Sequence, residues 1–126
     1  MMMALLNNEH SASTRMQGVS VAYELNKPDD EIVSVLVKTL NSDPNTNVRL
    51  AALDALSKFS REDGVCKSLI ESLATQKDPI IQIALIQLMV KMKEKSIVKQ
   101  LEKIATDNKT MKAVKTEAYL GIFKLS

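Results

Sequence analysis

Leu36–Phe59 reads LVKTLNSDPNTNVRLAALDALSKF, and Leu69–Met92 repeats the pattern as LIESLATQKDPIIQIALIQLMVKM. A third version, LEKIATDNKTMKAVKTEAYLGIFKL, covers Leu101–Leu125. A repeat of about 33 residues, made of two helical patterns joined by a short polar loop, is typical of an α-solenoid. We therefore predict an all-α superhelix built from stacked helix pairs.

The first half of each repeat has the apolar spacing of an amphipathic helix, called helix A below. In the segment Glu31–Leu40, apolar residues recur at intervals of three and four along one side. Pro28 precedes this segment, and Asp29 and Asp30 place acidic side chains at the positive end of the helix dipole. The pattern predicts that this helix begins near Asp29.

The second half of each repeat predicts a second helix, called helix B below. Its apolar positions recur once per repeat at a constant interval, as in Val48, Ile81 and Val114. The same apolar positions recur one repeat earlier, with an interval one residue longer, and they predict a further helix B at Ser13–Leu25. The helix A of that earlier pair would lie before or at Met1–Leu6 and would be mostly missing. We therefore expect three helix pairs plus one N-terminal orphan helix.

The length and composition suit one helical domain. The chain has 126 residues, and aromatic residues make up 3% of them, so aliphatic side chains must form the core. A single repeat cannot bury its apolar stripe, and stacking about three repeats does so. We predict one domain over residues 1–126, with repeats at about residues 1–25, 29–60, 63–93 and 95–126.

Two of the loops between helix A and helix B contain Asp-Pro. Asp43-Pro44 lies in the first full repeat and Asp78-Pro79 in the second. An Asp side chain can accept hydrogen bonds from the first N–H groups of a helix, and Pro suits the first helical position. These two loops therefore predict that Asp caps helix B and that Pro begins it.

The loop Asp43-Pro44, followed by Val48-Arg49-Leu50-Ala51-Ala52 and Ala55-Leu56, resembles the HEAT-repeat consensus. Asn47–Leu56 and Asp78–Val98 are also similar to the C-terminal HEAT domain of bacterial membrane-anchored proteins that resemble anti-sigma factors. Those proteins carry an N-terminal zinc finger and one membrane helix, neither of which this sequence contains. The resemblance therefore implies a distal domain outside the cytoplasmic membrane, in the periplasm, that binds or senses a protein. Without that resemblance, a cytoplasmic protein would be expected.

Polar side chains recur near the start of every helix B. These equivalent residues are Arg15, Arg49, Gln82 and Lys115. In HEAT repeats, this position commonly pairs with the loop Asp of a neighbouring repeat, and Asp43 and Asp78 are available for that pairing. The resemblance thus implies a structural ladder between repeats, interrupted at Gln82 because an amide cannot form a salt bridge.

A second polar set is the candidate contact with a partner. Asp54 and Lys58 in one helix B correspond to Gln87 and Lys91 in the next, opposite the apolar stripe. In the solenoids that this chain resembles, helix B lines the concave surface, where partners often bind. Plain exposure to solvent is the alternative interpretation of the same four residues.

No catalytic or metal site is predicted. The one histidine, His10, lies in a polar segment with no cysteine near it in sequence, whereas a zinc site needs about four ligands. The three glycines are too far apart to form a phosphate-binding loop. We therefore predict a non-enzymatic protein–protein interaction module with no cofactor and no metal.

The charge distribution suggests an alternative function. Residues 1–65 carry a net charge of −3, and residues 66–126 carry +5. A nucleic-acid-binding solenoid could use the lysines of the second half, Lys91, Lys93, Lys95, Lys99 and Lys103. Glu94 and Glu102 interrupt that series, and no Trp is present to stack on a base. A protein partner is therefore the prediction.

Two further expectations concern the surfaces of the chain. No apolar run reaches the roughly 18–20 residues needed to cross a bilayer, so this segment is not expected to contact a membrane. Leu120 and Phe123 are expected to be exposed on the last helix. Exposed apolar residues at the end repeats would leave self-association open.

Overall fold

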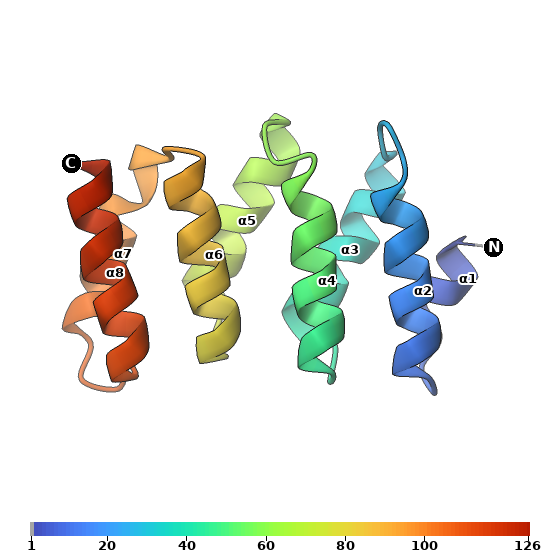
Figure 1. Cartoon of the computed structure of the whole chain (residues 1–126), viewed down its shortest axis with the longest axis horizontal. Helices are drawn as coiled ribbons and strands as arrows, with labels where there is room; N and C mark the ends of the chain where they lie inside the picture. The colour runs from blue at the N-terminus through green and yellow to red at the C-terminus, as the bar shows by residue number, and fades with distance from the viewer. Residues whose placement is uncertain (1) are drawn as a thin grey trace. The chain divides into compact units, whose positions relative to one another are not determined.

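The computed structural model describes residues 2–126, apart from the side chain of Asp63. The described residues form helices and no strand (Figure 1). The elements in chain order are α1 (Met2–Leu6), α2 (Ala12–Tyr23), α3 (Asp30–Ser42), α4 (Thr46–Ser57), α5 (Asp63–Thr75), α6 (Pro79–Lys91), the 3₁₀ helix η1 (Lys95–Ile97), α7 (Val98–Thr106) and α8 (Lys112–Leu125). The predicted all-α, helical-repeat fold is confirmed.

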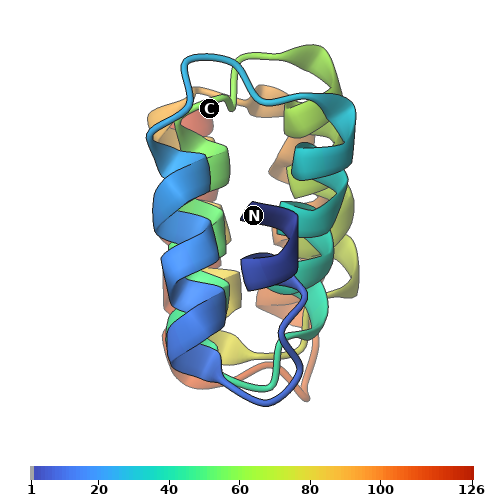
Figure 2. The same cartoon turned by 90° about the vertical axis from the view of Figure 1, so that its right-hand side faces the viewer.

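The chain divides into two compact units, Met1–Leu69 and Ile70–Ser126, and the boundary falls inside α5. In the first unit, α1 packs on α2, α3 packs on α4, and the two B helices α2 and α4 lie side by side. Figure 2 shows α2 in one layer of this unit and α3 in the other. In the second unit, α8 packs on both α7 and α6. The expectation of a single domain stays a prediction.

Helix A of the first full pair begins where the sequence indicates. The Asp29 side chain accepts a hydrogen bond from the backbone N–H of Ile32 at 2.8 Å, and Asp30 and Glu31 occupy the first turn of α3. The acidic side chains thus lie where the unsatisfied N–H groups of the helix concentrate positive charge.

The capping prediction is right for one Asp-Pro loop and wrong for the other. Pro79 begins α6, and the Asp78 side chain accepts from the N–H of Ile80 at 2.9 Å. In the other loop, α4 is capped by Asn45, which occupies the position equivalent to Asp78 one repeat earlier. Because that loop is longer, its Asp-Pro pair precedes the capping position. Asp43 is therefore available for a different contact.

The helix that was expected to be an orphan has a short partner. The five-residue α1 packs on α2, next to Gly18. A Cβ atom added to Gly18 would lie 2.8 Å from the backbone N of Leu6 and 3.0 Å from Cβ of Leu5. Glycine is therefore needed for this close approach. Met1 lies outside the described residues.

Each unit has an aliphatic core. Leu36, Leu40 and Leu56 are fully buried in the first unit, and Leu85 and Leu101 in the second. Burying a Leu side chain contributes about 1.5–3 kcal/mol, so these residues supply the main driving force for stacking. Three of the four aromatic residues are exposed, namely Tyr23, Tyr119 and Phe123. The core is therefore built from aliphatic side chains, as the composition predicts.

The end of α6 is closed by two backbone hydrogen bonds. The N–H of Lys93 donates to the carbonyl of Val90, and the N–H of Glu94 donates to that of Met89, both at 2.9 Å. This closure places Lys93 in the left-handed region, with φ of 59°. Glycine normally occupies this position, because a side chain there crowds the backbone.

We expect Lys93→Gly to raise the free energy of unfolding by about 0.5–1 kcal/mol, because glycine adopts the left-handed conformation without strain. Chemical denaturation followed by circular dichroism measures the change. Lys95→Gly is the matched control, since Lys95 has a negative φ and begins η1. An equal gain in both variants would contradict the explanation from backbone strain.

Ser72 offers a second test within the second unit. Its hydroxyl is buried and has no hydrogen-bond partner among the described residues. Thr39, at the equivalent position one repeat earlier, donates its hydroxyl to the carbonyl of Val35 at 2.8 Å. We expect Ser72→Ala to stabilise the protein by about 1 kcal/mol, because it removes an unsatisfied polar group. Thr39→Ala is expected to give no such gain in the same denaturation experiment.

Candidate functional site

Arg15 joins two repeats in the first unit. From α2, its Nε donates to Oδ2 of Asp43 at 2.6 Å, and Nη2 donates to Oδ1 at 3.1 Å. Nη1 donates to the backbone carbonyl of Asn8 at 2.9 Å. Arg15 and Asp43 are both largely buried at this contact. A two-pronged pair between a guanidinium and a carboxylate fixes orientation as well as distance, so it sets how α2 lies against the α3–α4 loop.

The positive charge of Arg15 is stabilised by its surroundings. The hydrogen bonds to Asp43 raise the pKa of Arg15 above its ordinary value, and the attraction of the carboxylate acts in the same direction. Partial removal from water acts in the opposite direction and is outweighed. The guanidinium therefore keeps its proton.

The equivalent residues of the next two B helices share one of these contacts. Nε of Arg49 donates to the carbonyl of Leu40 at 2.8 Å, and Nε2 of Gln82 donates to that of Gln76 at 3.0 Å. Like the Asn8 carbonyl, both acceptors lie near the end of the preceding helix A. Carbonyls at helix ends lack donors within the helix, so the polar side chain supplies one.

This shared contact explains a feature that the sequence left open. Gln82 cannot form a salt bridge, but its amide still satisfies a carbonyl at the end of helix A. The resemblance to HEAT repeats implied only pairing with Asp, not this hydrogen bond to a backbone carbonyl. In the last repeat, the side chain of Lys115 makes no hydrogen bond or ion pair with the described residues. Asp78 caps α6.

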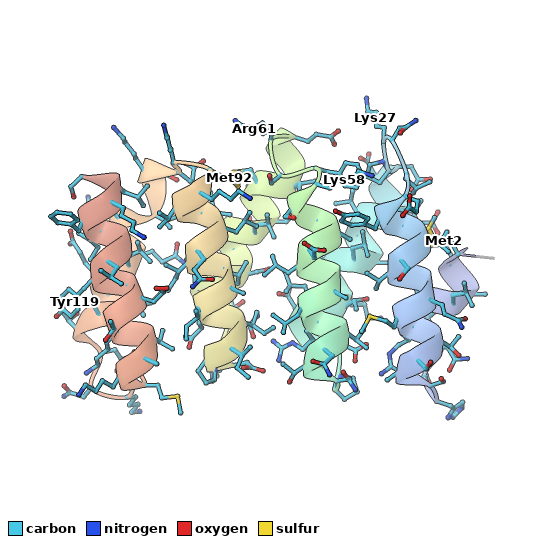
Figure 3. All side chains as sticks on the ribbon, viewed as in Figure 1. Met2, Lys27, Lys58, Arg61, Met92 and Tyr119 are labelled. Carbon is cyan, nitrogen blue, oxygen red and sulfur yellow. The ribbon has the colours of Figure 1, made fainter. Side chains whose placement is uncertain are left out.

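The four candidate contact residues of helix B are all exposed, but two of them link neighbouring helices. Nζ of Lys58 donates to the carbonyl of Tyr23 at the end of α2 and lies 5.0 Å from the centre of the Tyr23 ring (Figure 3). Nε2 of Gln87 donates to Oε1 of Glu117 on α8 at 2.8 Å. Asp54 and Lys91 make no side-chain hydrogen bond or ion pair with the described residues.

Two grooves lie in the first unit. One, of about 330 Å³, is lined by Val33 and Val37 of α3 and by Val65 of α5, with Asp30 and Glu62 also in its lining. The other, of about 420 Å³, lies beside the contact between Arg15 and Asp43. Since Arg15 already donates to protein acceptors, it lines that groove as a structural residue.

Comparison with known protein families matches residues 2–89 to HEAT repeats. The match covers more than half of the sequence. The chain belongs to the HEAT-repeat family. No curated protein and no solved structure matches it.

The HEAT match ends inside α6, so the pair α7–α8 lies beyond it. The sequence of this last pair departs from the repeat consensus. Asn108 replaces the loop Pro, and Lys115 replaces Arg. Met111 precedes α8 without a capping side-chain hydrogen bond. The last HEAT-like pair therefore forms the helical hairpin without the loop Pro, the Arg and the side-chain cap of the earlier repeats.

Other candidate features of this HEAT-repeat chain are also placed by the structure. The lysines considered for nucleic-acid binding are exposed in the second unit, at Lys91, Lys93, Lys95, Lys99 and Lys103. Leu120 and Phe123 are exposed on α8, as predicted. The described part of the chain contains no group of three or more metal-ligand side chains that could hold an ion. None of the described helices is both long and apolar enough to cross a bilayer.

We expect Arg15→Ala to lower the melting temperature, because it removes the bridge to Asp43 and leaves that largely buried carboxylate without its positive partner. Arg15→Lys should lose less, since it keeps the charge without the planar fork. Arg61→Ala, at an exposed position, is the control and should melt like the unchanged protein.

The double variant Arg15→Ala/Asp43→Ala separates direct pairing from independent effects. It should lower the melting temperature by less than the sum of the two single changes, because either change alone already breaks the contact. Strictly additive losses would show that the two side chains do not stabilise the fold through each other.

Proposed function

We propose that this chain is a non-enzymatic protein–protein interaction module whose partner contacts the exposed polar side of helix B. HEAT repeats commonly mediate contacts between proteins. The observation that carries the proposal is that only some of the polar side chains on that side bind neighbouring helices. Lys58 and Gln87 link adjacent helices, whereas Asp54 and Lys91 are exposed and make no side-chain polar contact with the described residues.

The non-enzymatic part of the proposal draws support from the family and from the polar contacts. HEAT repeats are a scaffold type without catalytic machinery of their own. The polar side chains held in place here satisfy helix ends and join repeats, as Arg15 and Gln82 do. Such contacts stiffen a surface, and a stiff surface loses little conformational entropy when a partner binds.

A narrower proposal concerns the larger protein. We propose that the chain is the distal domain of a bacterial regulatory protein resembling membrane-anchored anti-sigma factors. The support is the resemblance of Asn47–Leu56 and Asp78–Val98 to the HEAT domain of that class. Such a domain would lie in the periplasm, and outside that class a cytoplasmic location is proposed. A native gene encoding a zinc finger and one membrane helix before this segment would support the narrower proposal, and a gene encoding only this segment would contradict it.

Nucleic-acid binding is a second candidate, favoured by the exposed lysines of the second unit. Contacts with phosphate would make affinity fall steeply as salt increases. Titration of duplex DNA at low and moderate salt tests this candidate directly. Absence of binding at low salt would remove it.

We expect Asp54→Arg and Lys91→Glu to reduce capture of a partner protein, because each reverses a charge on the proposed contact surface. Capture by the immobilised chain, followed by quantification of each captured protein, measures the change. Glu71→Arg and Lys103→Glu are matched controls on A helices, where both residues are exposed. All four variants should melt like the unchanged protein, since surface substitutions usually cost less than about 0.5 kcal/mol.

Only a partner that is lost with the helix B variants and kept with the helix A variants fits the proposal. Equal loss in both sets would place the contact elsewhere. Retention by all four variants would contradict the proposed surface.

A further inference from the structure

The contact between α6 and α8 shows how one helix B presents its side chains to the next. A Cβ atom added to Gly121 would lie 3.3 Å from Cγ2 of Val90 and 3.4 Å from Cγ2 of Ile86. Ile86 and Val90 are one helical turn apart on α6, so together they form the ridge that meets α8. Gly121 lies on the side of α8 that receives this ridge.

The same ridge recurs on α8, with larger side chains. The residues that correspond to Ile86 and Val90 one repeat later are Tyr119 and Phe123. They are 58% and 81% exposed, and Leu120 beside them is 47% exposed. Figure 3 shows Tyr119 on the side of α8 turned away from α6. The open side of α8 thus presents a stacking ridge whose aromatic rings are exposed.

A receiving side that matches this ridge is exposed on α2. The position of Gly121 corresponds to Ala55 on α4, which is fully buried, and to Val21 on α2, which is 37% exposed. Gln17, one turn before Val21, is also exposed and corresponds to Glu117 on α8. The side of α2 that carries Val21 and Gln17 therefore corresponds to the side of α8 that α6 covers.

Charge decides which occupant fits the ridge on α8. Lys112, Lys115 and Lys124 outnumber Glu117 on this helix, so its net charge is +2. Two copies meeting through α8 would bring these like charges together, which is unfavourable. Arg15 is the charged residue of α2, and its charge is already paired with Asp43. The basic α8 therefore meets no unpaired like charge from α2 of a second copy.

We propose that the chain associates with copies of itself, the Tyr119–Phe123 ridge of one copy packing on the Val21 side of α2 in the next. In this contact, α8 of one molecule packs on α2 of another in the same way that α6 packs on α8 within the second unit. It joins two different surfaces, so a pair of copies still has one unused α8 ridge and one unused Val21 side. These surfaces are separate from the Asp54 and Lys91 positions of the proposed partner site.

Analytical ultracentrifugation of the full chain over a range of concentrations tests the proposal. The weight-average mass should rise with concentration, whereas Phe123→Glu and Val21→Glu should each remain monomeric. Every contact needs one α8 ridge and one α2 side, so each variant lacks one half of it. An equimolar mixture of the two variants retains one intact half of each kind. That mixture should form a heterodimer and grow no further.

Ile80→Glu is the matched control, because Ile80 is 54% exposed on α6 but lies on neither surface. It should associate like the unchanged chain, and circular dichroism should show that all variants are folded. A chain that is monomeric at its highest soluble concentration would overturn the proposal. So would loss of association in Phe123→Glu while Val21→Glu still dimerises, which would indicate contact through α8 alone.

Discussion

The first three helix pairs depend on how the end of helix A is satisfied. Carbonyls at that end have no donor within the helix, and leaving them unpaired next to a packed core is costly. A polar side chain near the start of the following helix B donates to such a carbonyl, as Arg15, Arg49 and Gln82 each do. Because that side chain belongs to the second helix of the pair, the hydrogen bond also fixes the hairpin. The aliphatic stripes then meet in one register.

A second set of contacts joins one B helix to the next. Lys58 reaches back to the last carbonyl of α2, and Gln87 reaches forward to Glu117 on α8. Both residues lie on the surface that was assigned to partner binding from sequence. A polar residue on that surface can therefore hold the repeats together, and exposure alone does not separate the two roles. Lys58 and Gln87 have hydrogen-bond partners on neighbouring helices, whereas the side chains of Asp54 and Lys91 have none among the described residues.

The fold was predictable because its signals repeat. Period, apolar stripes and the start of α3 at Asp29 all follow from spacing that recurs along the chain. The Asp43-Pro44 loop was misassigned because an insertion moved it away from the cap, which Asn45 provides. The hydrogen bond from Gln82 was missed because its acceptor is a backbone carbonyl, and no residue type in a sequence indicates such an acceptor. Likewise, the left-handed Lys93 could not be foreseen, since glycine is the usual signal for that conformation.

The placement of the aromatic residues determines which optical probes can follow this protein. There is no Trp, and both tyrosines are exposed. Tyrosine emission will therefore change little when the aliphatic core melts. It will respond instead to events at the surface beside Lys58 and on the open side of α8. Intrinsic fluorescence can thus report local binding in a chain whose helices remain intact, while far-ultraviolet dichroism reports the helices themselves.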